Sequence, residues 1–434
     1  MNDWLESRFK LRERNTDIQT EIIAGVTTFM TMAYIIFVNP DLLSAAGMPF
    51  DALMVSTCLA AAFATFLMAF LANYPIALAS GMGLNAFFAF TVVLGMGLSW
   101  QTVLAAVFIE GILFILLTLS KIRESVVNGI PLSLRYGIAA GIGLFIAFIG
   151  FQNGGLTVGD PATLVTLAPF RGNLPAILTI LGLIIIGALE AKRVKGAILW
   201  GIIIITIIAV PLGVAEMPKA IVSAPPSIAP IFMKMDFSSV ATGGFWVIVL
   251  TLFFVDFFDT VGTLVGVSGR ANLLDKNGNL PKAREALLAD AIGTAGGAVL
   301  GVSTVTAYVE SASGIGVGGR TGLTSLVTGL LFVLAIFFSP LVSIVPSCAT
   351  APALIFVGIY MMMSVTKIDF SDWTELLPAA AAIFVMPFSY SIASGIEFGV
   401  LSYAAIKLLT GKARNVSVVM WVLSVIFILK ELFI

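Results

Sequence analysis

The chain has 434 residues, of which 59% are hydrophobic and only 11% are charged, and its formal net charge is −1. Soluble proteins carry about 25% charged residues, so this composition excludes an ordinary soluble protein and predicts a lipid bilayer as the surroundings. The chain has no histidine, which excludes histidine proton relays and the usual histidine-based metal and hydrolase sites. No basic patch marks a soluble surface, so nucleic acid is not an expected partner.

Apolar runs long enough to cross a bilayer, about 17–25 residues each, follow one another along the chain. They lie at 20–39, 52–72, 98–119, 132–151, 174–190, 196–214, 243–268, 285–301, 322–345, 350–364, 374–391 and 394–410. Two shorter stretches rich in small residues, 77–90 and 303–317, lie between them, and counting both as crossings gives 14 segments. A last apolar run, 416–429, is expected either to span the membrane or to lie in its interface.

Lysine and arginine test this count, because they gather in cytoplasmic loops. With the N-terminus inside, 14 crossings place 19 of these residues in inside loops and their flanks, with Lys430 set aside, against three outside: Arg171, Lys219 and Lys234. Dropping either short stretch would invert the loops that follow and spoil the asymmetry. We therefore expect both short stretches to cross, residues 1–19 to form a cytoplasmic N-terminus, and residues 411–434 to carry a C-terminal apolar helix.

A proline-rich link at 215–242, expected outside, divides the crossings into seven and seven. Because seven is odd, the second half must enter the membrane from the opposite side, as an inverted repeat requires. The short stretch is the third crossing of each half, which supports the same interpretation. The predicted fold class is an all-α polytopic membrane protein, built as a 7+7 inverted repeat with short extended pieces in segments 3 and 10.

The two short stretches combine glycine with hydroxyl and amide side chains, as in Gly83 with Asn85 and in Ser311 with Gly314. Irregular backbone survives in a membrane only where protein or a water-filled cavity surrounds it. Each stretch is typical of an extended piece leading into a half-length helix, whose N-terminal N–H groups can meet a polar ligand. Close helix packing through small residues is the alternative, although packing alone does not predict matched positions in both halves.

Carboxylates inside the apolar segments are the second sign of function, because ionisable residues there are costly and functional by default. They are Glu110, Asp256, Asp259, Asp290, Glu310 and Glu397. No lysine or arginine lies deep in a span to pair with them, which points to a small-molecule transporter. A packing hydrogen bond is the alternative for Asp256 and Asp290, and a structural role is the expectation for Glu110 and Glu397.

Asp256 and Asp259 are three residues apart, so they share one helix face, which Thr260 and Thr263 extend. Two nearby carboxylates in a low-dielectric site cannot easily both be ionised. We therefore expect one of them to hold a proton that moves with the substrate. The aromatic residues of the broken stretches, Phe87, Phe88, Phe90 and Tyr308, beside carboxylates that accept N–H groups, suit a flat, nitrogen-rich heterocycle.

Four stretches carry a resemblance to a known family: TEIIAGVTTFMTMAYIIFVNP at 20–40, GMGLNAFFAF at 81–90, FVDFFDTVGTLVGV at 254–267 and STVTAYVESASGIGVGGRTG at 303–322. They resemble the AzgA-like purine permeases of the nucleobase:cation symporter-2 superfamily, nearly from end to end. The resemblance implies a core domain (20–119 and 243–345) and a gate domain (132–214 and 350–410). It also implies proton-coupled uptake of hypoxanthine and guanine, or of adenine, across the plasma membrane, without a cofactor beyond the coupling H⁺, in a chain that can form a homodimer.

The same resemblance implies roles for single residues. Asp259 and Glu310 match the acids that bind the base, Gly83 and Asn85 match the third-segment motif facing it, and Phe87 lies beside that motif. The backbone of Val309 and Ser311, beside Tyr308, matches the stretch that meets the ring. Asp256 and Asp290, with Asp259, match acidic positions linked to proton coupling. Thr263 stands near the position where uracil permeases carry a histidine, which suggests a different ring preference.

Three other functions remain open at this point. A uracil, xanthine or anion carrier could share the architecture, although an anion carrier would be expected to show a cation near the half-helices. A channel is possible in principle, but two enclosed half-helices favour a bound, occluded substrate. An intramembrane enzyme would need a nucleophile–base pair or a cluster of metal ligands, and the sequence has neither.

Overall fold

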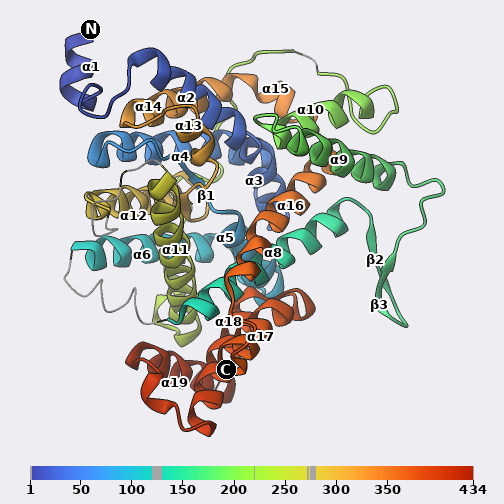
Figure 1. Cartoon of the computed structure of the whole chain (residues 1–434). Helices are drawn as coiled ribbons and strands as arrows, with labels where there is room; N and C mark the ends of the chain where they lie inside the picture. The colour runs from blue at the N-terminus through green and yellow to red at the C-terminus, as the bar shows by residue number, and fades with distance from the viewer. Residues whose placement is uncertain (1, 120–129, 219, 271–272, 274–279, 434) are drawn as a thin grey trace.

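The computed structural model describes residues 2–433 except 120–129, 219, 271, 272 and 274–279 (Figure 1). In this described part, eight helices are long and apolar enough to cross a membrane. Shorter apolar helices accompany them at Met82–Gly95, Ala197–Ala209, Gly243–Phe257, Trp373–Ser389 and Val418–Ile428. The predicted fold class, a polytopic helical membrane protein, is confirmed.

The first half of the chain forms a kinked first span, a long second helix, a broken third segment and four further helices. Its elements are α1 (Asn2–Phe9), α2 (Ile18–Met32), α3 (Ile35–Ser44), α4 (Phe50–Leu67), η1 (Met68–Ala72), β1 (Leu78–Ser80), α5 (Met82–Ala86), η2 (Phe87–Gly95), α6 (Trp100–Leu119), α8 (Leu132–Asn153), β2 (Thr157–Asp160), β3 (Leu164–Leu167), α9 (Leu174–Ala191) and α10 (Ala197–Ala209). Asp17 caps α2 by accepting a hydrogen bond from the Thr20 N–H at 2.9 Å.

The second half repeats the broken segment after two helices. Its elements are η3 (Ser238–Ala241), α11 (Gly243–Arg270), α12 (Ala283–Leu300), β4 (Val305–Ala307), α13 (Ser311–Gly316), α14 (Gly322–Ala335), η4 (Ile336–Phe338), α15 (Ser339–Val342), α16 (Ser347–Met362), η5 (Met363–Lys367), α17 (Trp373–Ser389), α18 (Ile392–Leu409), η6 (Ala413–Asn415) and α19 (Val418–Phe433). The two half-helices differ in length: α5 continues through the π-helix η2 to Gly95, whereas α13 ends at Gly316. The last apolar run forms α19, which packs against α18.

The two predicted extended pieces pair with each other at the centre of the fold. β1 and β4 are antiparallel, with Leu78 opposite Ala307 and Ser80 opposite Val305. The Gly81 N–H donates to the Thr304 carbonyl at 2.9 Å, and the Tyr308 N–H donates to the Ala77 carbonyl at 3.0 Å. Each strand thus satisfies the backbone groups of the other, which the hydrocarbon of a membrane could not do.

A buried threonine on a neighbouring helix holds each strand in a matching way. Thr65 of α4 accepts from the Leu78 N–H and donates to the Leu78 carbonyl, both at 3.0 Å. Thr294 of α12 does the same for Val305, at 3.2 and 2.8 Å. Leu78 and Val305 are the first residues of their strands, so the two contacts are equivalent positions of an inverted repeat.

The helices pack in two groups (Figure 1). The crossing group contains α2–α6 and α11–α14 and holds β1 and β4 between its helices. The flanking group contains α8–α10 and α16–α19, with α16 against α8 and α17 against α18 and α8. The β2–β3 hairpin extends away from the flanking group, and the N- and C-termini lie at opposite ends of the view (Figure 1).

Candidate functional site

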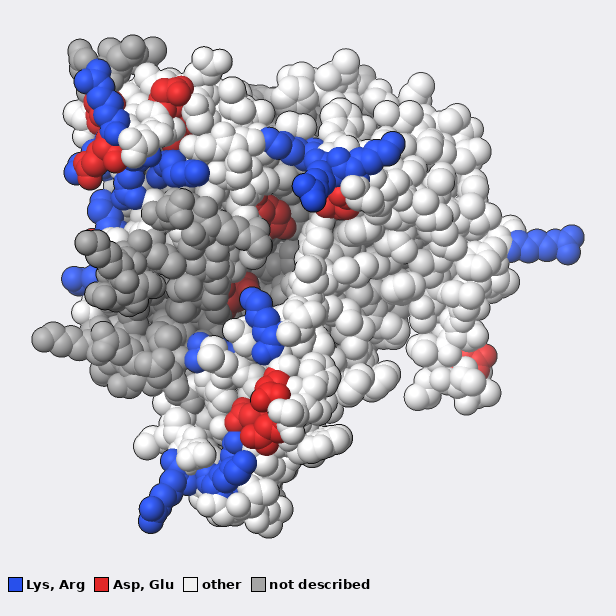
Figure 2. All heavy atoms as spheres, viewed as in Figure 1, with Lys and Arg blue, Asp and Glu red and all other residues white. Residues whose placement is uncertain are grey.

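Acidic side chains lie in a hollow between the two groups. Figure 2 shows red acidic atoms inside this hollow, on a face whose rim carries lysine and arginine. Asp259 on α11 is exposed although it lies in the middle of an apolar helix, and Val309, just after β4, is 57% exposed. Glu310, the next residue, is partly exposed. Asp259, Val309 and Glu310 are therefore accessible where the broken segments meet α11.

Glu310 is held in one position by the first span. It is the residue before α13, and its Oε1 accepts a hydrogen bond of 2.5 Å from the hydroxyl of Tyr34, which is 1% exposed at the break between α2 and α3. The hydroxyls of Thr31 and Ser313 lie 2.8 Å apart, and each lies within hydrogen-bonding distance of the Glu310 carbonyl, at 3.4 and 2.7 Å. Among the described residues, the other hydrogen bond to this carboxylate comes from the backbone N–H of Glu310 itself, and a carboxylate can accept further hydrogen bonds from a ligand.

The first broken segment contributes an amide with one free end. Asn85 is fully buried, and its Oδ1 accepts from the Ser80 hydroxyl at 2.8 Å. Its Nδ2 has no hydrogen-bond partner among the described residues. The Asn85 N–H makes the first helical bond of α5, to the Gly81 carbonyl at 2.8 Å, so the N–H groups of 82–84 precede the helical ladder. This end of α5 presents only donors.

Tyr308 and Ser311 use their hydroxyls to hold β1. The Tyr308 hydroxyl donates to the Ser80 carbonyl at 2.5 Å, and the Ser311 hydroxyl accepts from the Ala77 N–H at 3.0 Å. Both side chains are buried. Among the described contacts their role is therefore to support the strand pair, and the exposed Val309 between them is the part of this stretch that faces the hollow.

The three remaining predicted ligand-binding residues lie in packed surroundings. Gly83 abuts α8, because an added Cβ would come within 2.6 Å of Ile142 Cγ2. Phe87 is buried in the largest apolar cluster. Thr263 is buried one turn beyond Asp259 on α11. Gly83 thus marks a close approach between the crossing and flanking groups.

A chain of side-chain contacts joins α12, α11 and β4 behind the hollow. The Thr260 hydroxyl lies 3.0 Å from Asp290 Oδ1 and 2.7 Å from the Thr306 hydroxyl. Asp259 lies beside the same Thr306 and close enough to Glu310 for their charges to interact. The structure therefore brings Asp259, Glu310 and Asp290 into one polar region.

The other three intramembrane carboxylates, Asp256, Glu110 and Glu397, lie in two different parts of the fold. Asp256 on α11 is fully buried and contacts Glu110 of α6, which the sequence had set apart as structural. Glu397 lies on α18 in the flanking group and is buried there. Position along the chain gave no sign that Glu110 and Asp256 meet.

Sequence reasoning missed the partners of Glu310 and one buried ion pair. Tyr34 and Thr31 lie in the quoted N-terminal motif, whose polar residues in an apolar span were the available signal. Lys407 of α18 is 3% exposed and lies 2.6 Å from Glu375, so a buried cation does exist in the flanking group.

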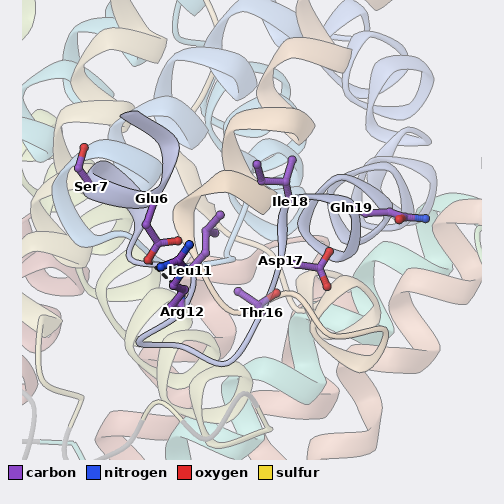
Figure 3. A pocket seen from close by; sticks show the side chains of 8 residues that line it. All are labelled: Glu6, Ser7, Leu11, Arg12, Thr16, Asp17, Ile18 and Gln19. Carbon is purple, nitrogen blue, oxygen red and sulfur yellow. Dashed lines mark hydrogen bonds between the residues drawn. The ribbon is translucent and has the colours of Figure 1, made fainter. Parts of the chain in front are cut away.

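A separate depression lies between the polar N-terminal segment and the start of α2 (Figure 3). Its lining includes Glu6, Arg12 and Asp17, and the Arg12 N–H donates to Glu6 Oε1 at 3.1 Å. Asp17 is occupied as the cap of α2. None of the predicted site residues lines this depression.

Comparisons with known proteins agree with the geometry. Residues 19–399 match the model of a family described as the permease family. The chain is 46% identical over 433 residues to the adenine permease AdeP of Escherichia coli, covering 99% of this chain and 96% of that one. It is 43% identical over 440 residues to the guanine/hypoxanthine permease PbuG of Bacillus subtilis, covering 99% and 100%. The transmembrane domain of a cyanobacterium bicarbonate transporter, BicA, has the same fold, with a TM-score of 0.64 at 16% identity over 87% of this chain and 97% of that one.

Proposed function

Because this chain belongs to the permease family, we propose that it imports purine nucleobases together with protons. The relatives described above are an adenine permease and a guanine/hypoxanthine permease, which supports a purine as the substrate. The observation that carries the proposal is Glu310: a carboxylate held by Tyr34, with acceptor capacity left for a ligand, beside the exposed Asp259. A ligand that offers several N–H groups in one plane fits these acceptors.

The chemistry of a 6-oxopurine matches the donors and acceptors of the hollow. Glu310 and Asp259 accept hydrogen bonds from ring N–H groups, and bonds to ionised acceptors are about twice as strong as neutral ones. Asn85 Nδ2 and the first N–H groups of α5 are donors, and they suit the carbonyl oxygen of hypoxanthine or guanine better than the amino group of adenine. We therefore place hypoxanthine and guanine before adenine.

The build of the site supports an elevator-like transport step. Both broken segments, one from each half, are tied together by β1 and β4 and contact α11, so we expect them to move as one body. The crossing group corresponds to the proposed core domain and the flanking group to the gate domain. An elevator-like displacement of core against gate would carry the site across the membrane, with the Gly83–Ile142 approach as one sliding contact.

Proton coupling is assigned to the intramembrane carboxylates. Asp256, Asp259 and Asp290 lie in one region, and no described salt bridge reaches them. Charge neutralisation there by H⁺ lets the core domain cross the membrane with little net charge, since moving bare charges through hydrocarbon is costly. The coupling ion proposed is therefore H⁺, and no other cofactor is required.

The direct test is uptake of radiolabelled hypoxanthine in cells that lack purine transport. Wild-type protein should restore saturable uptake that a protonophore abolishes, and Glu310→Gln and Asp259→Asn should each lose it. Asp51→Asn is the matched control, because Asp51 is an exposed carboxylate at the start of α4. Normal uptake by both site variants would refute the site, and uptake that ignores external pH and the protonophore would refute proton coupling.

The same assay separates the alternatives. Competition by uracil, xanthine or bicarbonate, rather than by hypoxanthine and guanine, would indicate a different carrier of this architecture. The cation expected of an anion carrier does not lie at Glu310 in the described part, since Arg320 binds the Ile315 and Gly319 carbonyls at the opposite end of α13. Flux that never saturates would indicate a channel. The homodimer stays a prediction, testable by light scattering of the purified protein.

A further inference from the structure

Two buried carboxyl groups face each other between α6 and α11, apart from the proposed ligand contacts. Glu110 and Asp256 are both 0% exposed, and their carboxyl groups are in contact. Among the described residues, no donor makes a hydrogen bond to any of their four oxygens. The hydroxyl of Thr304 faces Glu110 and is itself buried without a hydrogen-bond partner in that part of the chain. A buried carboxylate without a donor is strongly disfavoured.

Among the described residues, no cationic side chain contacts this pair. The described salt bridges lie in the N-terminal segment and in the flanking group. The titratable neighbours on the packed helices are all acidic: Asp290 on α12, Asp259 on α11 and, beyond it, Glu310. β4 and η2, which also pack here, carry no titratable side chain. The described residues contain no cluster of acidic, cysteine or histidine side chains arranged to hold a metal.

Protons remain as the groups that can complete the pair. One proton lets either carboxyl group donate an O–H to the other carboxylate, which supplies the missing donor. Losing that proton would leave two facing charges in a medium of low dielectric, so it should stay bound. A second proton neutralises the remaining charge, and because the singly charged pair already has an internal hydrogen bond, this proton can leave again.

A line of polar contacts connects the pair to the hollow. Asp290 lies close to Asp256 and accepts from Thr260 at 3.0 Å. Thr260 contacts the Thr306 hydroxyl at 2.7 Å, and Thr306 lies beside the exposed Asp259. The buried pair is therefore linked through hydroxyl groups to the acid beside the proposed purine position.

We propose that Glu110 and Asp256 hold one permanent bridging proton and reversibly bind a second, and that this second proton is the one transported with the purine. The inference rests on the proposed function, proton symport, and extends it by making Glu110 a coupling residue that does not touch the substrate. Binding the second proton converts one carboxylate into a carboxylic acid, and releasing it on the opposite side restores the singly charged pair.

The test uses purified full-length protein in proteoliposomes that contain a pH-sensitive dye. Proton entry and radiolabelled hypoxanthine entry are measured together, and hypoxanthine–hypoxanthine exchange is measured without a pH gradient. In the double variant Glu110→Gln with Asp256→Asn, both groups are neutral amides that can still donate to and accept from each other, and neither can bind a proton. We expect hypoxanthine-driven proton entry to be lost while exchange continues. Wild-type proton entry per hypoxanthine in this double variant would overturn the proposal.

A second variant guards against a purely structural effect. Exchanging the two side chains, Glu110→Asp with Asp256→Glu, keeps both carboxyl groups and their combined length, so it should show the proton entry that the diamide double variant has lost. A folded exchange variant that stays as uncoupled as the diamide double variant would count against the pair. Asp372→Asn changes a partly exposed acid in the flanking group; it serves as the control and should couple normally.

The ion and the function are tested separately. If a sodium gradient drives uptake by the wild type, and the diamide double variant abolishes only that drive, the pair is a sodium site and the proton proposal is wrong. If the wild type exchanges hypoxanthine but never moves protons with it, proton symport itself fails. Retained coupling in the diamide double variant, with a coupled wild type, refutes only the role of the pair.

Discussion

Replacing Tyr34 by phenylalanine tests the claim that the first span positions the acid that binds the purine. The change removes one oxygen, and with it the 2.5 Å hydrogen bond to Glu310 Oε1. Tyr34 is almost completely buried, so water cannot replace the donor without rearrangement. A hydrogen bond to a charged group contributes about 1.5–3 kcal/mol. If the carboxylate loses its fixed orientation, hypoxanthine binding should weaken by about 10- to 150-fold.

The measurement is the hypoxanthine Kd of purified protein, with the melting temperature recorded alongside. Tyr74→Phe is the matched control: Tyr74 is also buried, and its hydroxyl accepts from the Lys282 N–H at 3.0 Å, away from the proposed site. It should leave the Kd close to the wild-type value. A wild-type Kd in Tyr34→Phe would refute the reasoning, and equal weakening in both variants would show that the effect comes from general destabilisation.

Two further predictions concern stability. Hydrogen bonds from the Thr20 N–H and hydroxyl hold the pKa of Asp17 below its ordinary value. The stabilisation of α2 by Asp17 is therefore present above the unfolded pKa and is lost as the pH falls through the lower folded pKa. Hydrogen exchange at the start of α2 should speed up in acid, and Asp17→Ala should show the fast rate already at neutral pH. Lys407→Met leaves the Glu375 carboxylate without its partner and should destabilise the protein by about 3–5 kcal/mol, towards the lower end because Glu375 is partly exposed. Thermal unfolding measures the loss, and adding Glu375→Leu should recover part of it. An unchanged melting temperature in Lys407→Met would contradict the assignment.

The spans were predictable because the membrane acts on each segment by itself. Insertion depends on local hydropathy and on where lysine and arginine fall, and both are properties of consecutive residues. The broken segments 77–90 and 303–317 were predictable for the same reason, because glycine and hydroxyl residues interrupt apolar runs there. It did not set their lengths: the first half-helix continues as η2, and α13 is much shorter than the half-length helix expected.

Intramembrane carboxylates were also visible in the sequence, because an acid in hydrocarbon is costly wherever it stands. Their grouping was not visible. Tyr34 and Glu310 are separated by 276 positions, and Thr260 meets Thr306 across 46. Contacts at such distances depend on which helices pack together, and helical periodicity says only which residues share a face.

By itself, the sequence determined a multi-pass helical protein with two broken segments and acids placed beside them. Only the tertiary structure decided that β1 and β4 complete each other's hydrogen bonds, that Tyr34 fixes Glu310, and that Glu110 faces Asp256. The physical reason is the same in each case. Hydrophobicity acts along the chain, whereas a hydrogen bond or a shared proton needs two groups that packing alone brings together.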